Sequence, residues 1–284
     1  MSHYFSEQAP ICMGTFPLKG NELATATKHA FEAGYRGFDT AQMYENEAAL
    51  GSAFAEIGCP RESLFLTTKV LPAHLGKDKF MVSVEESLRA LKTDYVDVLL
   101  LHWPTPSREN REALELLQQA VNKGYAKFIG VSNYTIEMME EACATLDDIP
   151  VCNQVEFHPY LDQSKLFAAA TRLGIALSAY CPLAKGKIFG DPVIRTLAAK
   201  YDRSEAQIIL RWIVQKGVSA NPMSTKPENL RANLEALNFN LSAPDSAAID
   251  RLGAKGLRIV NKDRMPIAPE LSLIHISEPT RPID

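Results

Sequence analysis

The sequence predicts one domain of the α/β class, a (β/α)8 barrel of the TIM type, and three observations support this. Short segments rich in β-branched and aromatic residues alternate with amphipathic segments almost from end to end, which is typical of βαβ units and a parallel sheet. Eight strand-like segments can be counted. The chain has 284 residues, a length that suits one barrel of about 250 residues.

The expected strands are short, and the most apolar of them, VDVLLL, suits a strand that is covered on both faces. The eight lie at 11–14, 35–39, 64–68, 95–101, 126–132, 151–157, 175–180 and 218–223. An open doubly wound sheet is the alternative fold. It is less favoured because no GxGxxG motif follows the first strand.

Amphipathic segments between and after these strands predict helices. They lie at 21–34, 77–92, 107–124, 135–146, 163–174, 204–217 and 227–237. Several end in a glycine just past the last periodic residue, as a left-handed helix C-cap requires. These glycines are Gly34, Gly124, Gly174 and Gly217.

Composition and sequence patterns limit the binding partners and the cellular compartment that we expect for this chain. The net charge of −4 and the interspersed charges argue against a nucleic-acid partner. Five scattered cysteines without CxxC or Cys/His ligand spacing argue against disulfides and structural zinc. The N-terminus lacks a signal-peptide pattern, and no run of about eighteen apolar residues occurs. We therefore expect a cytoplasmic monomer with no membrane partner.

The C-terminal segment departs from the barrel pattern. Residues 271–281 read like the translation of a transposase adapter used in sequencing libraries, joined in frame after Glu270. We therefore expect the barrel in residues 1–270 and a non-native tail, which is no part of the fold, in residues 271–284. A genuine apolar C-terminal arm is the alternative.

Three strand segments run into polar or ionisable side chains. Asp39 and Tyr44 lie in GFDTAQMY, Lys69 ends FLTTK, and His102 follows VDVLLL. Successive sites are about 30 residues apart, close to the roughly 31 residues of one βα unit in a barrel. Because a barrel builds its active site at the carboxyl ends of the strands, these side chains should converge at one mouth.

Each of these residues has an ordinary explanation when it is taken singly. Asp39 could cap a helix, and Tyr44 could be a packed aromatic residue. Lys69 could be solvated, and His102 could be a core histidine. Only the joint spacing favours a functional site.

The segments GFDTAQMYENE, LTTK, LLLHWP, GVSNY, NQVEFHP, SAYCPLA and PMSTKPENLRAN follow the order found in aldo-keto reductases. Over roughly residues 10–270 the chain resembles this family, and in particular its prokaryotic branch similar to 2,5-diketo-gluconate reductases. The resemblance implies a (β/α)8 barrel that transfers hydride from NADPH to an aldehyde or ketone, without metal or flavin.

The resemblance also implies a role for each reactive residue. Tyr44 would give a proton to the carbonyl oxygen. Lys69 would draw the pKa of that phenol toward the operating pH, and Asp39 would keep Lys69 charged and oriented. His102 would hydrogen bond the substrate oxygen.

Cofactor residues carry over from the same resemblance. Ser132, Asn133 and Gln154 would hold the nicotinamide carboxamide, and Tyr180 would stack on the ring. The loop with Cys181, Leu183 and Ala184 would approach the pyrophosphate, although Cys181 by itself suits a buried thiol. The other expected cofactor residues are Ser224, Thr225, Lys226, Arg231 and Asn233.

The chain departs from the family where the adenosine phosphate would bind. Many members have Lys and Arg where this chain has Met223 and Asn229. Lys226 and Arg231 lie close enough in sequence to replace these contacts. NADPH is the expected cofactor, and use of NADH stays open.

Phe16 and Trp103 match aromatic wall positions of the family's substrate pocket, whereas His74 is expected to be a surface residue. The predicted function is NADPH-dependent reduction of small aldehydes, α-dicarbonyls or keto-sugars. A cofactor-sensing regulatory barrel with little turnover is the alternative. A metal-dependent hydrolase is disfavoured because no cluster of carboxylates and histidines occurs at the strand ends.

Overall fold

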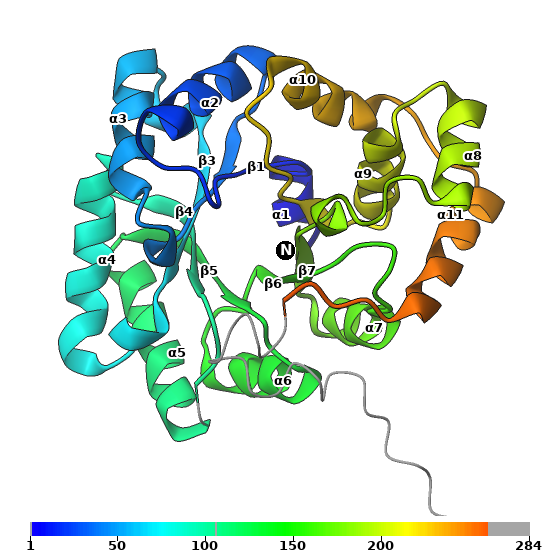
Figure 1. The fold of residues 1–284 in the computed structure, drawn as a ribbon. Coiled ribbons are helices and arrows are strands. Elements are labelled where there is room, and N and C mark those ends of the chain that lie inside the picture. Colours follow the sequence, from blue (N-terminus) through cyan, green and yellow to red (C-terminus); the bar gives the residue numbers. More distant parts are fainter. Residues whose placement is uncertain (1, 106, 261–284) are drawn as a thin grey trace, which may run out of the picture.

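The computed structural model describes residues 2–105 and 107–260. Within them, eight parallel strands form one sheet whose order follows the chain (Figure 1). The strands are β1 (Met13–Gly14), β2 (Gly37–Asp39), β3 (Phe65–Val70), β4 (Val96–Leu101), β5 (Ala126–Ser132), β6 (Cys152–Glu156), β7 (Ala176–Tyr180) and β8 (Ser219–Ala220). Each predicted strand is present, although β1, β2, β6 and β8 are shorter than expected by two residues or more.

Backbone contacts join the two edges of this sheet. Ile11 and Ala220 form an isolated parallel bridge. The Cys12 N–H donates to the Ala220 carbonyl at 2.9 Å, and the Gly14 N–H donates to the Pro222 carbonyl at 3.0 Å. The sheet therefore curls round on itself, which is consistent with the predicted (β/α)8 barrel in a single domain.

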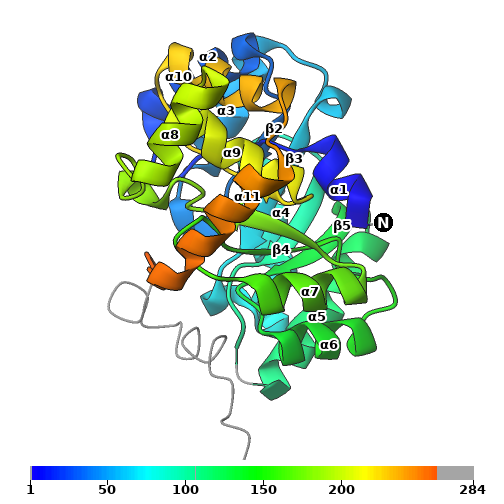
Figure 2. The same cartoon turned by 90° about the vertical axis from the view of Figure 1, so that its right-hand side faces the viewer.

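Helices surround the sheet in both views (Figures 1 and 2). They are α1 (Ser2–Gln8), α2 (Gly20–Ala33), α3 (Glu47–Ile57), α4 (Lys77–Leu91), α5 (Ser107–Asn122), α6 (Ile136–Thr145), α7 (Ser164–Leu173), α8 (Pro192–Tyr201), α9 (Glu205–Gln215), α10 (Pro227–Glu235) and α11 (Ala243–Asp250). All the predicted helices are confirmed. The helices α1, α3, α8 and α11 are additional to those that the sequence patterns predicted.

The predicted terminal glycines take the backbone conformation that was expected of them. Gly34 and Gly174 are C-caps with φ of 110° and 74°. The φ values of Gly124 and Gly217 are 77° and 80°. The helix ends at these positions were therefore predictable from one residue type.

Apolar side chains pack on both faces of the sheet. In β4, Leu99 and Leu101 belong to the outer core beneath the helices. Val98 and Leu100 belong to an inner core that also contains Phe5 of α1. This alternation explains why VDVLLL lacks an exposed side.

The amino ends of the strands are covered by α1. Phe5 packs edge-on against Phe65, the first residue of β3, with ring centroids 5.7 Å apart. Figure 2 places α1 at one end of the molecule, with α8 and the end of α11 toward the other. The carboxyl ends of the strands are therefore left to build the site.

No helix in the described part of the chain is long and apolar enough to cross a membrane. Within residues 2–105 and 107–260, no three His, Cys, Asp or Glu side chains form a group able to hold a metal ion. The expected domain end at Glu270 and the expected non-native tail lie outside the described residues. The cytoplasmic location and the monomeric state stay predictions.

Candidate active site

The four predicted catalytic side chains meet at the carboxyl ends of neighbouring strands. Asp39 ends β2, Tyr44 ends the short helix η1 (Gln42–Tyr44), Lys69 lies near the end of β3, and His102 follows β4. The Lys69 ammonium donates to Asp39 Oδ1 at 2.5 Å and to the Tyr44 hydroxyl at 3.4 Å. The rings of Tyr44 and His102 meet edge-on, with centroids 5.6 Å apart.

Lys69 is a fully buried cation whose charge is compensated on several sides. Besides Asp39, its ammonium reaches the Thr40 carbonyl at 2.8 Å. Burial lowers the pKa of Lys69, but Asp39 and Tyr44 raise it by more, so the net pKa lies above its usual value. Lys69 therefore stays charged, as predicted, and it places a positive charge beside the Tyr44 hydroxyl.

The net pKa of Tyr44 shifts in the direction opposite to the one expected. Burial raises it more than the neighbouring Lys69 lowers it. The prediction took account of the Lys69 charge but not of the low dielectric around the buried phenol, which disfavours a phenolate. Tyr44 is therefore a protonated phenol at neutral pH, which is the form that a proton donor needs.

His102 is neutral in this environment. Burial lowers its pKa well below 6.5, and the Lys69 charge lowers it further. A neutral imidazole has a single N–H to donate. Nδ1 of His102 is buried and has no hydrogen-bond partner among the described residues. The arrangement thus holds one protonated phenol and one neutral imidazole side by side.

The predicted nicotinamide-binding residues form a hydrogen-bonded chain that reaches Asp39. The Gln154 side-chain amide donates to Asp39 Oδ2 at 2.6 Å, and the Ser132 hydroxyl donates to the backbone carbonyl of Gln154 at 2.8 Å. The Asn133 amide donates to Ser132 Oγ at 3.1 Å, and the Tyr180 hydroxyl donates to Asn133 Oδ1 at 2.8 Å. The network fixes these amide groups next to the catalytic residues.

One cavity of about 650 Å³ collects most of the predicted residues. Those that line it are Phe16, Asp39, Tyr44, His102, Trp103, Ser132, Asn133, Gln154, Tyr180, Cys181 and Leu183, and Met223, which stands where many family members have Lys, lines it as well. Lys69 does not line the cavity but lies behind it, in contact with Asp39 and Tyr44. It therefore acts on any bound molecule through its neighbours.

Sequence reasoning missed several lining residues. They are Gly14, Thr15, Pro17, Met43, Pro182, Lys185, Gly186, Phe189, Asn221, Pro222 and Val260. Gly14 ends β1, and all the others except Val260 lie in the loops that follow β1, β2, β7 and β8, so their place in the sequence was an available signal. Val260 follows no strand, and nothing in its local sequence indicated its place.

The loop after β7 has an unusual backbone. Cys181, Ala184 and Lys185 have φ of 49°, 48° and 50°. Positive φ is uncommon for residues other than glycine, and such residues gather at functional sites. Ala184 is buried and does not line the cavity, whereas Cys181 and Lys185 do.

The predicted phosphate-binding residues are not brought to the cavity. Lys226, the residue before α10, and Arg231, on α10, are both exposed. Ser224 Oγ accepts the Lys226 N–H at 3.2 Å. Thr225 lies in the same loop. Asn233 is buried on α10. None of these five lines the cavity.

Aromatic side chains flank the predicted catalytic residues, at the positions expected to form the pocket wall. The Phe16 ring lies 5.1 Å from that of Tyr44 and is half exposed. The buried Trp103 ring stacks near His102 at 6.4 Å. His74 is not a free surface residue, because it is partly buried and its Nδ1 lies 3.0 Å from Gln42 Oε1.

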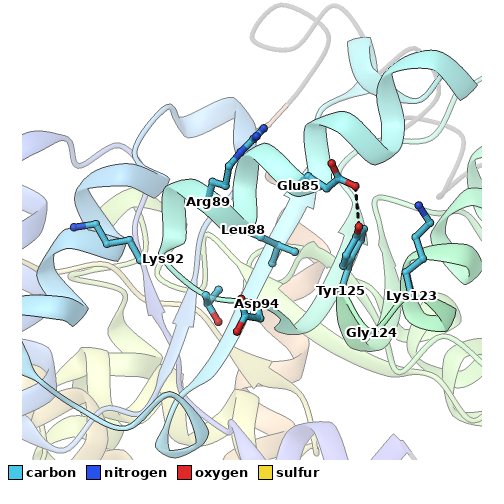
Figure 3. Close-up of a pocket in the computed structure, with 9 residues that line it drawn as sticks. Glu85, Leu88, Arg89, Lys92, Asp94, Lys123, Gly124 and Tyr125 are labelled. Atoms are coloured by element: carbon cyan, nitrogen blue, oxygen red, sulfur yellow. Dashed lines mark hydrogen bonds between the residues drawn. The ribbon is translucent and has the colours of Figure 1, made fainter.

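A second hollow of about 700 Å³ lies near the starts of β4 and β5. It is lined by Glu85, Leu88, Arg89, Lys92, Thr93, Asp94, Lys123, Gly124 and Tyr125. Figure 3 shows the Tyr125 hydroxyl directed at Glu85, to which it donates at 2.8 Å. This hollow contains none of the predicted site residues.

Comparison with known proteins agrees with this geometry. The model of the Aldo/keto reductase family matches residues 10–254. The methylglyoxal reductase DkgB of Escherichia coli O157:H7 is 44% identical over 261 residues, which cover 91% of this chain and 97% of that protein.

Solved structures give the same result. A putative 2,5-diketo-D-gluconic acid reductase B has a TM-score of 0.88 and 39% identity, covering 92% of each chain. An aldo-keto reductase from Bombyx mori, solved in complex with NADP, has a TM-score of 0.81 and 31% identity, covering 89% of this chain and 92% of that one. The chain therefore belongs to the aldo/keto reductase family, and it is an oxidoreductase.

Proposed function

We propose that this reductase converts small, uncharged aldehydes and α-dicarbonyls of the methylglyoxal type to alcohols, with NADPH as the hydride donor and Tyr44 as the proton donor. The observation that carries the proposal is the arrangement of Tyr44, Lys69 and His102. A protonated phenol touches a buried ammonium and adjoins a neutral imidazole. This set suits a carbonyl oxygen that gains negative charge and then a proton.

The residues on the cavity wall fit a nicotinamide cofactor. Asn133 and Gln154 offer amide groups, and Tyr180 offers an aromatic ring, all lining the cavity that holds Tyr44. A nicotinamide cofactor supplies hydride when it is bound. Lys226 and Arg231, exposed near the start of α10, are the cations available to the phosphate of NADPH.

Each catalytic side chain then has a distinct role. Tyr44 gives its proton to the substrate oxygen while the charge of Lys69 stabilises the phenolate that is left. Asp39 keeps Lys69 oriented, and Gln154 holds the second oxygen of Asp39. His102 donates its N–H to the substrate oxygen, so that the carbonyl carbon is presented in a fixed orientation.

The cavity wall favours small substrates without charge. Phe16, Met43, Trp103 and Phe189 give it an apolar lining. Among the described lining residues, Lys185 is the single cation. An uncharged α-dicarbonyl therefore suits this wall better than a keto acid. The name of the relative DkgB, a methylglyoxal reductase, supports the same substrate class.

The test is the consumption of NADPH and of NADH by the purified protein with methylglyoxal, together with identification of the alcohol product. We expect turnover with NADPH and formation of the alcohol in equal amount. Tight cofactor binding without turnover on any small aldehyde or keto-sugar would instead favour the cofactor-sensing barrel. A higher kcat/KM with NADH would overturn the choice of NADPH.

A further inference from the structure

The end of β6 holds a buried carboxylate that the mechanism above does not use. Glu156 is the last residue of β6, and its side chain has no solvent exposure. Its Oε1 accepts the Ile259 N–H at 2.6 Å, and its Oε2 accepts the Val260 N–H at 2.9 Å. His158 Nε2 lies 3.0 Å from Oε1. A side chain of the barrel thus holds two consecutive amides that are about a hundred residues away in sequence.

Neighbouring contacts fix the same C-terminal segment. The Leu257 N–H donates to the Tyr160 carbonyl at 2.8 Å. Lys255, at the end of the short helix η6 (Arg251–Lys255), donates to Asp191 Oδ2 at 2.6 Å. Residues 255–260 are therefore tied to the loops after β6 and β7.

This segment forms part of the cavity wall. Val260 lines the cavity that contains Tyr44 and His102. Ile259, beside it, is buried in the outer core. Because Glu156 receives both N–H groups, it fixes which of the two side chains faces the core and which faces the cavity.

The energetics favour a positioning role for this carboxylate. A buried carboxylate is costly unless hydrogen bonds compensate it, and bonds from backbone N–H groups to a charged oxygen are among the stronger ones. The Arg258 guanidinium lies 4.0 Å from Oε2, so backbone amides are the nearer donors. Among the described residues, the Glu156 carboxylate forms hydrogen bonds with His158, Ile259 and Val260 and does not contact Asp39, Tyr44 or Lys69.

We propose that Glu156 is a positioning residue that holds Val260 in the wall of the cavity and thereby sets the affinity for the carbonyl substrate. The proposal rests on the proposed function, because it assigns Val260 to the substrate side of that site. It predicts an effect on KM for the substrate rather than on the proton transfer, since the Tyr44 and Lys69 contacts are untouched.

The test compares Glu156→Gln, Val260→Ala and the double variant with wild type. Glutamine keeps the size of Glu156 but turns one acceptor into a donor, which then faces a backbone N–H. We expect either single change to raise KM for methylglyoxal about tenfold, as one lost apolar contact in a pocket does. The kcat should stay within about twofold, and the double variant should resemble the worse single variant because both act through the same wall.

Hydrogen exchange and a control variant test the role of Glu156 independently of turnover. Hydrogen exchange at the Ile259 and Val260 amides should be slow in wild type and fast in Glu156→Gln, whether or not the protein turns over. Glu140→Gln is the matched control, because it removes a carboxylate from the exposed pair with Arg172. That control should leave both KM and exchange unchanged.

Several results would overturn the proposal. They are slow exchange at both amides in Glu156→Gln, an unchanged KM in Val260→Ala, or KM effects that multiply in the double variant. If Glu156→Gln does not fold, Val260→Ala alone decides the role of the wall. An inactive wild type with protected amides would contradict the proposed function while leaving the contact of Glu156 with this segment intact.

Discussion

The side of the cavity at β2–β4 differs sharply from the side after β8. At β2–β4, Asp39 and Lys69 are buried and hydrogen bonded to each other, and Lys69 also donates to the Tyr44 hydroxyl. After β8, Lys226 and Arg231 are exposed and do not line the cavity. The side proposed to donate the proton is therefore preorganised by the fold, whereas the side expected to meet the cofactor phosphate relies on exposed cations.

This difference has an energetic origin. A buried ion pair must be compensated by further hydrogen bonds, and removing one partner leaves an uncompensated charge. Asp39 meets this requirement with Lys69 on one oxygen and Gln154 on the other. Exposed cations are screened by water and salt, so each contributes little. The effects of substitutions on the two sides should consequently differ in magnitude.

The largest effect is expected for Lys69→Met. It leaves Asp39 buried without its cation and should lower the free energy of unfolding by about 3–5 kcal/mol. Chemical denaturation measures this change. Lys127→Met is the control, because Lys127 is half exposed and its partner Asp97 keeps Arg61. A loss below about 1 kcal/mol, as at exposed pairs, would show that the Asp39–Lys69 pair is not the anchor described here.

His102→Asn should act on turnover rather than on folding. Removing the imidazole donor should lower kcat about 10²-fold, which is the usual effect of losing one donor to a developing oxyanion. Steady-state kinetics with methylglyoxal, together with a cofactor titration, separates turnover from binding. His74→Asn provides the control, since His74 contacts Gln42 outside the cavity. Wild-type turnover in His102→Asn would remove this histidine from the mechanism.

A smaller effect is expected on the β8 side. Replacing Lys226 and Arg231 together by Met should raise KM for NADPH about threefold and leave kcat unchanged, because exposed ion pairs contribute about 0–1 kcal/mol. The effect should shrink in high salt. Lys200→Met, on α8, is the control for loss of an exposed lysine. A hundredfold rise in KM would mean that these cations hold the phosphate as firmly as a buried site.

The smallest effect is expected from pH. The pKa of Tyr44 is raised above 10.0 by burial, so more than half of this proposed proton donor stays protonated up to that pH. The pKa of His102 is lowered well below 6.5, so the imidazole stays neutral above that pH. The kcat/KM for reduction should therefore vary by less than about twofold between pH 6.5 and pH 10. A midpoint near neutrality would contradict these protonation states.

Local sequence patterns predicted the strands and the convergence of the catalytic residues. A polar side chain at or just after the end of a buried strand lies at the carboxyl end of the sheet. Parallel strands bring these ends together, which is why Asp39, Lys69 and His102 could be placed. The helix α3 was missed because small apolar residues cover most of its faces and leave no periodic pattern.

Features that depend on contacts between residues far apart in the chain could not be predicted from local sequence patterns. The direction of the Tyr44 pKa follows from burial, which no motif records. Val260 lines the cavity, and its N–H donates to Glu156, about a hundred residues earlier in the chain. His74 Nδ1 lies 3.0 Å from Oε1 of Gln42, which belongs to the short helix η1. Each of these is a tertiary contact without a local signal.

The most direct test of the central claim is the single-turnover rate of NADPH oxidation with methylglyoxal in wild type and in Tyr44→Phe. Phenylalanine removes the hydroxyl and keeps the ring. The rate should fall about 10²- to 10⁴-fold, the range for loss of a general acid, while the Kd for NADPH should stay unchanged. A variant that keeps the wild-type rate would show that Tyr44 is not the proton donor.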